Sequence, residues 1–146
     1  MKDAFGGIMN IMLITVFLVI VSGILGFIVC YSKAFRMKNI VISNIERYEG
    51  SQSCFKLSNN SACSKRIMEF AKGIGYSPSG FHCDDGYKEV QNSEGRVIFC
   101  YTANTTENRH VVYSVLTKVD INIPIIDKIM GMPFFQIKGD TRVINR

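Results

Sequence analysis

One long stretch without charge near the start of the chain constrains the fold more than any other feature. No Asp, Glu, Lys or Arg occurs in residues 4–32, and residues 8–31 read IMNIMLITVFLVIVSGILGFIVCY. At about 1.5 Å rise per residue, a helix of these 24 residues spans the roughly 30 Å hydrocarbon core of a bilayer. Because a helix satisfies its own backbone hydrogen bonds in lipid, the sequence predicts a transmembrane helix.

A buried core helix and a cleaved secretory signal both fit this segment less well. A core helix needs only about 10 to 14 apolar residues, and a small domain cannot surround a longer one. A secretory signal also begins with positive charge, here Lys2, but its apolar region runs about 7 to 15 residues and ends at a small-residue cleavage site. This segment is longer and continues into Cys30 and Tyr31 without such a site. We therefore expect a retained membrane anchor.

Helical periodicity continues beyond the apolar segment. Apolar side chains recur at every third or fourth position, namely Ala34, Met37, Val41, Ile45 and Tyr48. No Pro interrupts the stretch, and Gly50 is a typical helix terminator. The sequence predicts one helix over residues 4–49, about 70 Å long, whose outer half is an amphipathic stalk. Its apolar stripe can pack on the chain's own domain, on neighbouring subunits, or on both.

The chain is expected to divide into this anchor and stalk, residues 1–50, and one small domain, residues 51–146. The domain contains four cysteines: Cys54, Cys63, Cys83 and Cys100. Three pairings are possible, and chain proximity favours joining the first to the second and the third to the fourth. A zinc site is the alternative, but there is no C-x-x-C, and His82 and His110 are the only histidines. We expect disulfides, with Cys30 left inside the span.

The sequence gives conflicting indications of the side of the membrane on which the domain lies. Lys33, Arg36 and Lys38 follow the span, whereas Lys2 and the terminal amine precede it, so the positive-inside rule favours a cytoplasmic domain. Persistent disulfides require an oxidising compartment and favour the opposite side. We give the cysteines more weight, because a short N-terminal tail is a special case of translocation. The prediction is a single-pass protein of the cell membrane with an extracytoplasmic domain.

The domain is predicted to be α+β, with a short helix and a small antiparallel sheet tied by disulfides. The helix should cover residues 62–74, with Ser61 as its N-cap. Strands are expected over residues 81–90 and 96–102, joined by a hairpin-like connection. A period of two over residues 111–123, in which Ser114, Lys118, Asp120 and Asn122 fall on one face, predicts a strand with one buried and one wetter face. A helical turn at 125–130 and an antiparallel last strand at 134–144 complete the expected order.

Residues that could carry catalysis or bind a ligand are few. The net charge of +5 is spread thinly, with no basic run in the domain longer than Lys65-Arg66, so we expect no nucleic-acid binding. His82 beside Cys83 could form a Cys–His dyad, but we favour a histidine at the end of a strand, beside a structural cystine and a polar turn at Asp84-Asp85-Gly86. Asp84 and Asp85 fall far short of a calcium-ligand set. We expect neither an enzyme nor a bound cofactor or metal.

Small and polar residues within the span suggest a helix-packing surface. Ser22, Gly23 and Gly26 form a small-residue patch, which lets helices approach closely. Asn10 is a polar side chain in the apolar stretch, and it could bond a neighbouring helix or lie near the interface. Cys30 could form an intermolecular bridge, accept a lipid or simply act as a small hydrophobic residue.

This arrangement of hydrophobic helix, amphipathic stalk and disulfide-tied sheet resembles type IV pilin-like proteins. The nearest group is the Tad-type, TadE-like pseudopilins, to which VCYSKAFRMKN at 29–39 and IERYEG at 45–50 are similar. The resemblance is architectural over the whole chain and local over residues 5–50. It implies a subunit whose helix packs against other helices in an assembly.

Pilin precursors are cleaved after a Gly just before the apolar run. Gly6-Gly7 occupies that place here, behind a charged leader. Pilin signatures also carry a Glu a few residues after the cut, where this chain has Asn10 and Met12. The chain thus shares the place of the cleavage site with pilins and departs from them at the Glu.

The leading hypothesis is a pilin-like structural subunit of a pilus or secretion assembly. Its partners would be the lipid bilayer and other membrane or pilus-assembly subunits, with a homo-oligomer possible. The alternative is a membrane-tethered binding module that holds a ligand or a partner protein on its sheet or on the apolar segment 125–135. A third interpretation, a membrane-bound thiol enzyme, requires Cys83 or Cys100 to be free and reactive.

Overall fold

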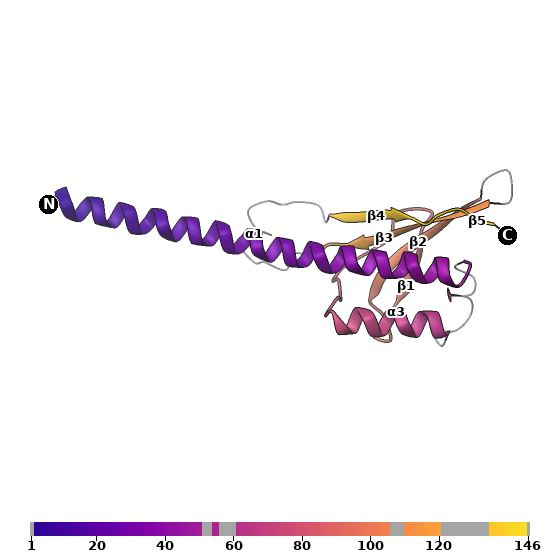
Figure 1. Cartoon of the computed structure of the whole chain (residues 1–146). Coiled ribbons are helices and arrows are strands. Elements are labelled where there is room, and N and C mark those ends of the chain that lie inside the picture. The colour runs from indigo at the N-terminus through magenta and orange to yellow at the C-terminus, as the bar shows by residue number, and fades with distance from the viewer. Residues whose placement is uncertain (1, 51–53, 56–60, 106–109, 121–134, 146) are drawn as a thin grey trace.

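The structure is a computed structural model that describes residues 2–50, 54–55, 61–105, 110–120 and 135–145 (Figure 1). The helices are α1 (Lys2–Arg47) and α3 (Ala62–Gly73), and the strands are β1 (Lys88–Gln91), β2 (Val97–Thr105), β3 (His110–Lys118), β4 (Gln136–Asp140) and β5 (Ile144–Asn145). Figure 1 shows α1 as a long rod whose second half lies along the sheet, with α3 beside it. The predicted α+β class is confirmed.

Helix α1 runs without interruption from the apolar segment into the domain. Its 46 residues correspond to about 69 Å. The helix ends at Arg47, two residues before the predicted end, because Glu49 takes a left-handed conformation (φ 52°). The Gly50 N–H then donates to the Ile45 carbonyl at 2.9 Å, which satisfies an end-of-helix carbonyl. A non-glycine residue therefore occupies the position at which glycine is usual.

Helix α3 has the predicted N-cap and nearly the predicted length. The Ser61 hydroxyl accepts from the Ser64 N–H at 3.1 Å, and its own hydrogen is donated to the Cys54 carbonyl at 2.6 Å. At the other end, Gly75 has a φ of +63° and donates to the Lys72 carbonyl. The Tyr76 N–H reaches the Ala71 carbonyl, so the end of α3 is a Schellman motif.

The sheet is antiparallel throughout and has the order β1-β2-β3-β4, with β5 pairing further along β3. β4 and β5 occupy the place of the predicted last strand, and their antiparallel pairing to β3 confirms that expectation. The strand is interrupted at Thr141, whose hydroxyl accepts from the Tyr113 N–H at 3.0 Å. β3 ends at Lys118, so Val119 and Asp120 do not belong to it, although the strand was predicted to run to residue 123. The rest of that prediction, residues 121–123, and the predicted helical turn at 125–130 lie outside the described residues.

The prediction of a strand over residues 81–90 is wrong for most of its length. Only Lys88–Gln91 forms β1. The preceding residues turn at Asp84-Asp85-Gly86, where the Tyr87 N–H donates to the Asp84 carbonyl at 3.1 Å and Gly86 has a φ of +90°. β2, in contrast, extends three residues beyond its predicted end, to Thr105.

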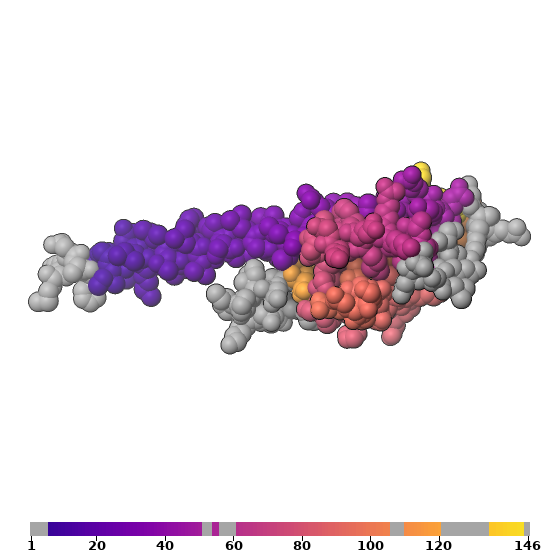
Figure 2. Space-filling view, turned by 90° about the horizontal axis from the view of Figure 1, so that it is seen from below, coloured from indigo at the N-terminus to yellow at the C-terminus, as the bar shows by residue number. Residues whose placement is uncertain are grey.

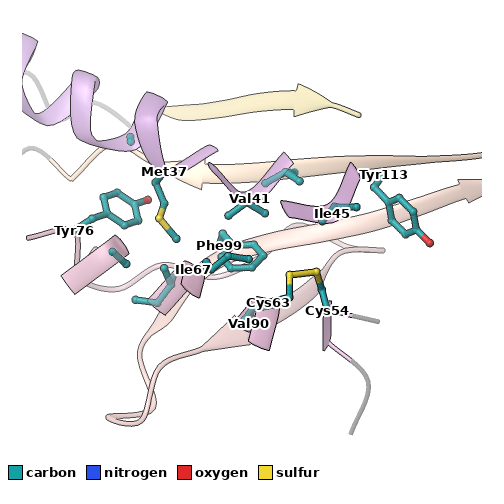
Figure 3. Close-up of a cluster of buried hydrophobic side chains, with 14 of the residues drawn as sticks. Met37, Val41, Ile45, Cys54, Cys63, Ile67, Tyr76, Val90, Phe99 and Tyr113 are labelled. Atoms are coloured by element: carbon teal, nitrogen blue, oxygen red, sulfur yellow. A yellow bond between two sulfur atoms is a disulfide. The ribbon is translucent and has the colours of Figure 1, made fainter. Parts of the chain in front are cut away.

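One face of the sheet packs against both helices and forms the main core (Figure 3). The stripe of α1 contributes Ala34, Met37, Val41 and Ile45, each fully buried. Ile67 and Ala71 of α3 and Phe99 of β2 complete the centre of the cluster. A bulge between β1 and β2 leaves Ile98 without a partner in the register, so Ile98 and Phe99 both join this core. The outer half of α1 is thus part of the domain's core.

The opposite face of the sheet is also covered, which the alternation in β3 did not predict. Phe81, Val97, Cys100 and Leu116 form a second buried cluster, with Cys83 and Tyr87 packed against it. The segment 81–87 crosses this face instead of pairing as a strand. Ser114 and Lys118, which were expected on the wetter face, are only 2% and 1% exposed. The prediction of one wetter face for β3 is wrong, because a segment distant in sequence covers it.

Both disulfides join the cysteines that chain proximity favoured. Cys54–Cys63 links the segment after α1 to the first turn of α3. Cys83–Cys100 fastens the covering segment to β2. The second bond therefore ties a segment that lies outside the strands to a strand of the sheet.

Candidate functional site

The half of α1 that precedes the domain is exposed along its whole apolar length. Ile8 is 66% exposed, Leu18 60% and Val29 54%, although α1 is buried from Ala34 onward at every third or fourth residue. Figure 2 shows this half projecting from the domain as a rod. In the part of the chain that the structure describes, α1 is the one helix long and apolar enough to cross a membrane. This surface is the candidate functional site.

Hydroxyl groups on the exposed half are satisfied within the helix. The Thr15 hydroxyl donates to the Ile11 carbonyl and the Ser22 hydroxyl to the Val19 carbonyl, both at 2.9 Å. Such bonds remove the cost of placing a hydroxyl in lipid. The exposed Asn10 amide makes no hydrogen bond among the residues that the structure describes, so it is the polar group of this segment that needs an external partner.

The helix does not bring all four predicted packing residues together. Ser22, Gly23 and Gly26 share one face, but Asn10 lies about 160° around the helix from Gly26, at 100° per residue. The small-residue patch points in nearly the same direction as the stripe that packs on the sheet, because Gly23 and Ala34 are separated by three turns. Two helix contacts, one through Asn10 and one through the patch, would therefore involve different neighbours.

Cys30 marks the boundary between the exposed and the packed halves of α1. Its thiol is free and partly buried, and its side chain packs against the main core. Of the three roles considered for Cys30, this placement favours that of a small hydrophobic residue, at the end of the domain nearest the exposed half of α1.

A shallow groove of about 580 Å³ lies between α3 and the β1–β2 hairpin. Its floor is apolar, with Met68, Ala71 and Ile98, and its rim carries charges of both signs, including Lys72 and Glu94. A binding module would use this groove; the apolar segment 125–135, which was also a candidate, lies outside the described residues except for Phe135.

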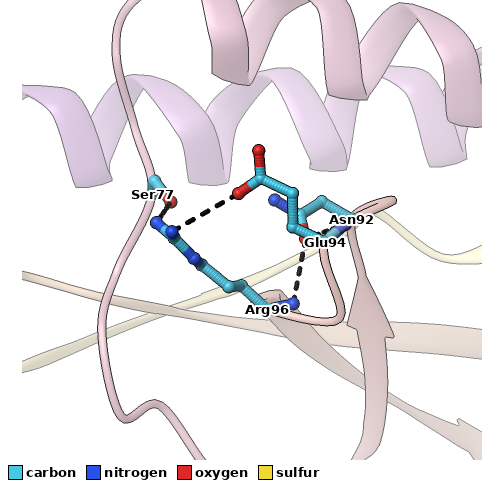
Figure 4. Close-up of polar contacts among 4 residues, drawn as sticks. All are labelled: Ser77, Asn92, Glu94 and Arg96. Atoms are coloured by element: carbon cyan, nitrogen blue, oxygen red, sulfur yellow. Dashed lines mark hydrogen bonds and ion pairs between the residues drawn. The ribbon is translucent and has the colours of Figure 1, made fainter.

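Polar contacts at the hairpin hold one side of the groove (Figure 4). Arg96 donates to the Ser77 hydroxyl at 3.0 Å and lies 3.5 Å from the Glu94 carboxylate. The Asn92 side chain accepts from the Glu94 and Arg96 N–H groups, which fixes the turn between β1 and β2. Because Arg96 and Glu94 are both well exposed, their ion pair contributes little stability.

A buried polar cluster lies where β3 meets the segment after α3. The Tyr76 hydroxyl donates to the Lys118 carbonyl at 2.7 Å and accepts from the Lys118 N–H at 3.0 Å. The Lys118 ammonium donates to the Ser79 carbonyl, and Asp120 accepts from the Ser79 N–H. Burial raises the pKa of Tyr76 above its usual range, and burial lowers the pKa of Lys118, against the attraction of Asp120. Sequence patterns missed this cluster, because Tyr76 and Lys118 lie far apart along the chain and nothing local marks the pair.

Replacing Tyr76 by Phe should lower the free energy of unfolding by about 1–3 kcal/mol, because two buried backbone groups of Lys118 lose their partner. The raised pKa of Tyr76 adds a pH dependence. Below the unfolded-state pKa near 10 its contribution is complete, and it is lost as pH rises toward the folded-state pKa. Chemical denaturation of the full chain in detergent at pH 7 and pH 11 should show a smaller alkaline loss in the variant. Tyr87→Phe, on the opposite face of the sheet, is the control. It should change little either the free energy of unfolding at pH 7 or the loss of stability between pH 7 and pH 11.

The cysteines of the domain are not available as nucleophiles or as metal ligands. Cys83 and Cys100 are bonded to each other, so the thiol-enzyme interpretation lacks the free thiol that it requires. His82 is exposed beside that disulfide. Across the described ranges, no group of three or more His, Cys, Asp or Glu residues is placed to hold a metal ion.

Comparison of the chain with protein-family models, with curated proteins and with solved structures found no match.

Proposed function

We propose that this chain is a membrane-anchored, pilin-like structural subunit whose exposed helix packs against other helices of a pilus or secretion assembly. One observation carries the proposal: a single helix changes, without a break, from an exposed apolar rod to a helix whose apolar stripe is fully buried in the core. Residues 6–29 provide about 36 Å of exposed apolar helix, enough for one bilayer crossing.

Contacts beyond simple anchoring are favoured by the surface of the rod. Asn10 presents an amide without a hydrogen bond among the described residues, and such a group in lipid favours a neighbouring polar partner. The Ser22, Gly23 and Gly26 patch allows a second helix to approach closely. The continuity of α1 would fix the domain relative to these contacts, as a structural subunit requires.

The domain is proposed to lie outside the cytoplasm. Two disulfides in a domain of fewer than 100 residues are typical of oxidising compartments. Labelling of cysteines in intact and in permeabilised cells, before and after reduction, would test the side. Reaction of Cys83 or Cys100 with a membrane-impermeant reagent only after permeabilisation would contradict an outside domain.

Self-association through the span can be tested by oxidative crosslinking of a Ser22→Cys variant in a Cys30→Ser background. We expect a crosslinked dimer in membranes, because Ser22 lies on the small-residue patch. Gly26→Leu in the same background should abolish most of the dimer by keeping the helices apart. The control is Val21→Leu, which also introduces a Leu but lies about 140° around the helix from Gly26, and it should leave the dimer intact. Equal crosslinking in all three variants would exclude packing through the patch.

The second candidate, a membrane-tethered binding module, is favoured by the groove between α3 and the β1–β2 hairpin. A protein of this kind should bind its ligand equally well after the Gly26→Leu substitution, because its span would only anchor it. It should lose its ligand when the groove is filled, for example by Ala71→Phe.

A further inference from the structure

We propose that the end of the domain nearest the exposed rod is a second membrane contact, in which aromatic side chains of α1 and of the residue just before β4 lie in the headgroup layer of the bilayer. The contact is formed by Phe27, Tyr31, Phe35 and Phe135, with Arg36 and Lys38 beside them. The inference rests on the proposed anchoring by α1. It adds that the domain itself touches the membrane and is not held clear of it by the stalk.

The four rings form one continuous aromatic surface. Phe135 meets Phe27 edge to face, with ring centroids 6.0 Å apart. Phe27 lies 6.1 Å from Tyr31, and Tyr31 stacks on Phe35 at 6.3 Å. Tyr31, Phe35 and Phe135 remain 45%, 41% and 46% exposed, so this surface is largely uncovered in the folded chain.

The position of Phe27 on the helix places this surface at the edge of the bilayer. A hydrocarbon core of roughly 30 Å takes about 20 helical residues, so a span beginning at Ile8 ends at Phe27. Shifting the span by one turn moves this boundary by about 5 Å, which is within the depth of the headgroup layer. Phe135 lies beside Phe27 and therefore at the same level.

Phe135 immediately precedes β4 and is held beside the end of β3 by the backbone. Its carbonyl accepts from the Val119 N–H at 2.8 Å, directly beyond β3. A residue of the domain, far from α1 in the sequence, is thus fixed at the level of the membrane boundary. The domain consequently touches the bilayer at a second point, beside the helix that anchors it.

The chemistry of the neighbouring residues fits lipid headgroups better than another protein. Aromatic side chains are enriched at membrane interfaces, and basic residues are attracted to lipid phosphates. The Lys38 ammonium lies 4.3 Å from the centroid of the Phe35 ring, and Arg36 is exposed one residue beyond that ring. No acidic residue occurs between Phe27 and Lys38, so nothing in this part of the helix repels phosphate.

Depth-dependent fluorescence quenching tests the inference, since the chain contains no Trp and any introduced Trp is a unique reporter. The full chain would be placed in phosphatidylcholine–phosphatidylglycerol vesicles containing lipids brominated near the headgroup or deep in the acyl chain. We expect Phe135→Trp to lose emission most strongly with the shallow quencher. Val143→Trp, 55% exposed on the far part of the sheet, should lose none.

A second variant, Phe17→Trp, separates this inference from the proposed anchoring, because it should be quenched most by the deep lipid. If Phe17→Trp is quenched and Phe135→Trp is not, the second contact is excluded while the anchor stands. If Phe17→Trp is not quenched, the anchoring itself is wrong. Blue-shifted but unquenched emission from Phe135→Trp would mean that protein, either this chain or a second copy of it, covers the ring, and would overturn the inference. Gln136→Trp, at an exposed neighbouring position, gives the same measurement should Phe135→Trp fail to fold.

Discussion

Replacing Phe99 by Ala should lower the free energy of unfolding by about 3–5 kcal/mol, the largest effect expected of a single substitution in this chain. Phe99 is fully buried in the cluster in which α1, α3 and the sheet meet. Removal of the ring leaves a cavity between three elements that cannot all move inward, so little of the lost contact is recovered. Since small domains are stable by only about 5–15 kcal/mol, the loss would remove a large part of the total.

The measurement is denaturant unfolding of the full chain in detergent, followed by circular dichroism. Phe70→Ala provides a matched control, because Phe70 packs against the same cluster but is only partly buried. It should cost about 1 kcal/mol. Equal effects of the two substitutions would contradict the central place of Phe99 in the core.

Removal of the Cys83–Cys100 disulfide by the double replacement with Ser should cost about 2–5 kcal/mol. The bond closes a loop with a sequence separation of 17, for which chain entropy alone gives roughly 3 kcal/mol. It also holds segment 81–87 over Leu116, so its loss should raise hydrogen exchange in β3 as well as lower the unfolding midpoint.

The control for this experiment is Cys30→Ser, which removes a thiol that is free and only partly buried. That variant should unfold close to the wild-type midpoint. Retention of full stability by the Cys83→Ser, Cys100→Ser variant would mean that Phe81 and its neighbours hold the covering segment without the bond.

The parts of the fold predicted most accurately are those determined by local pattern. The uncharged stretch and the apolar stripe from Ala34 to Ile45 predicted α1 to within two residues at each end. Ser61 indicated the start of α3, because N-cap preference depends only on nearby backbone groups. Chain proximity was enough for both disulfide pairings, because each joins cysteines that are neighbours in the sequence.

The features that were missed depend on residues distant in sequence. The alternation in β3 could not indicate that segment 81–87 covers its second face. The turn at Asp84-Asp85-Gly86 was recognised, but a strand was predicted to run through it, whereas β1 begins only after it. The contact between Tyr76 and Lys118 follows from how the segment after α3 crosses the end of β3. The position of Phe135 beside Phe27, and hence its depth relative to the bilayer, depends on the antiparallel register of β4 with β3, which no sequence pattern specifies.

The absence of any break in α1 has a consequence for the geometry of an assembly. A straight helix transmits rotation, so the angular direction that the sheet faces is tied to the angular position of every residue in the span. One residue added between Gly26 and Ala34 would turn the domain by about 100° and lift it by about 1.5 Å relative to Asn10 and the small-residue patch. The number of residues between these two parts of the helix therefore sets which side of the domain a neighbouring chain would meet.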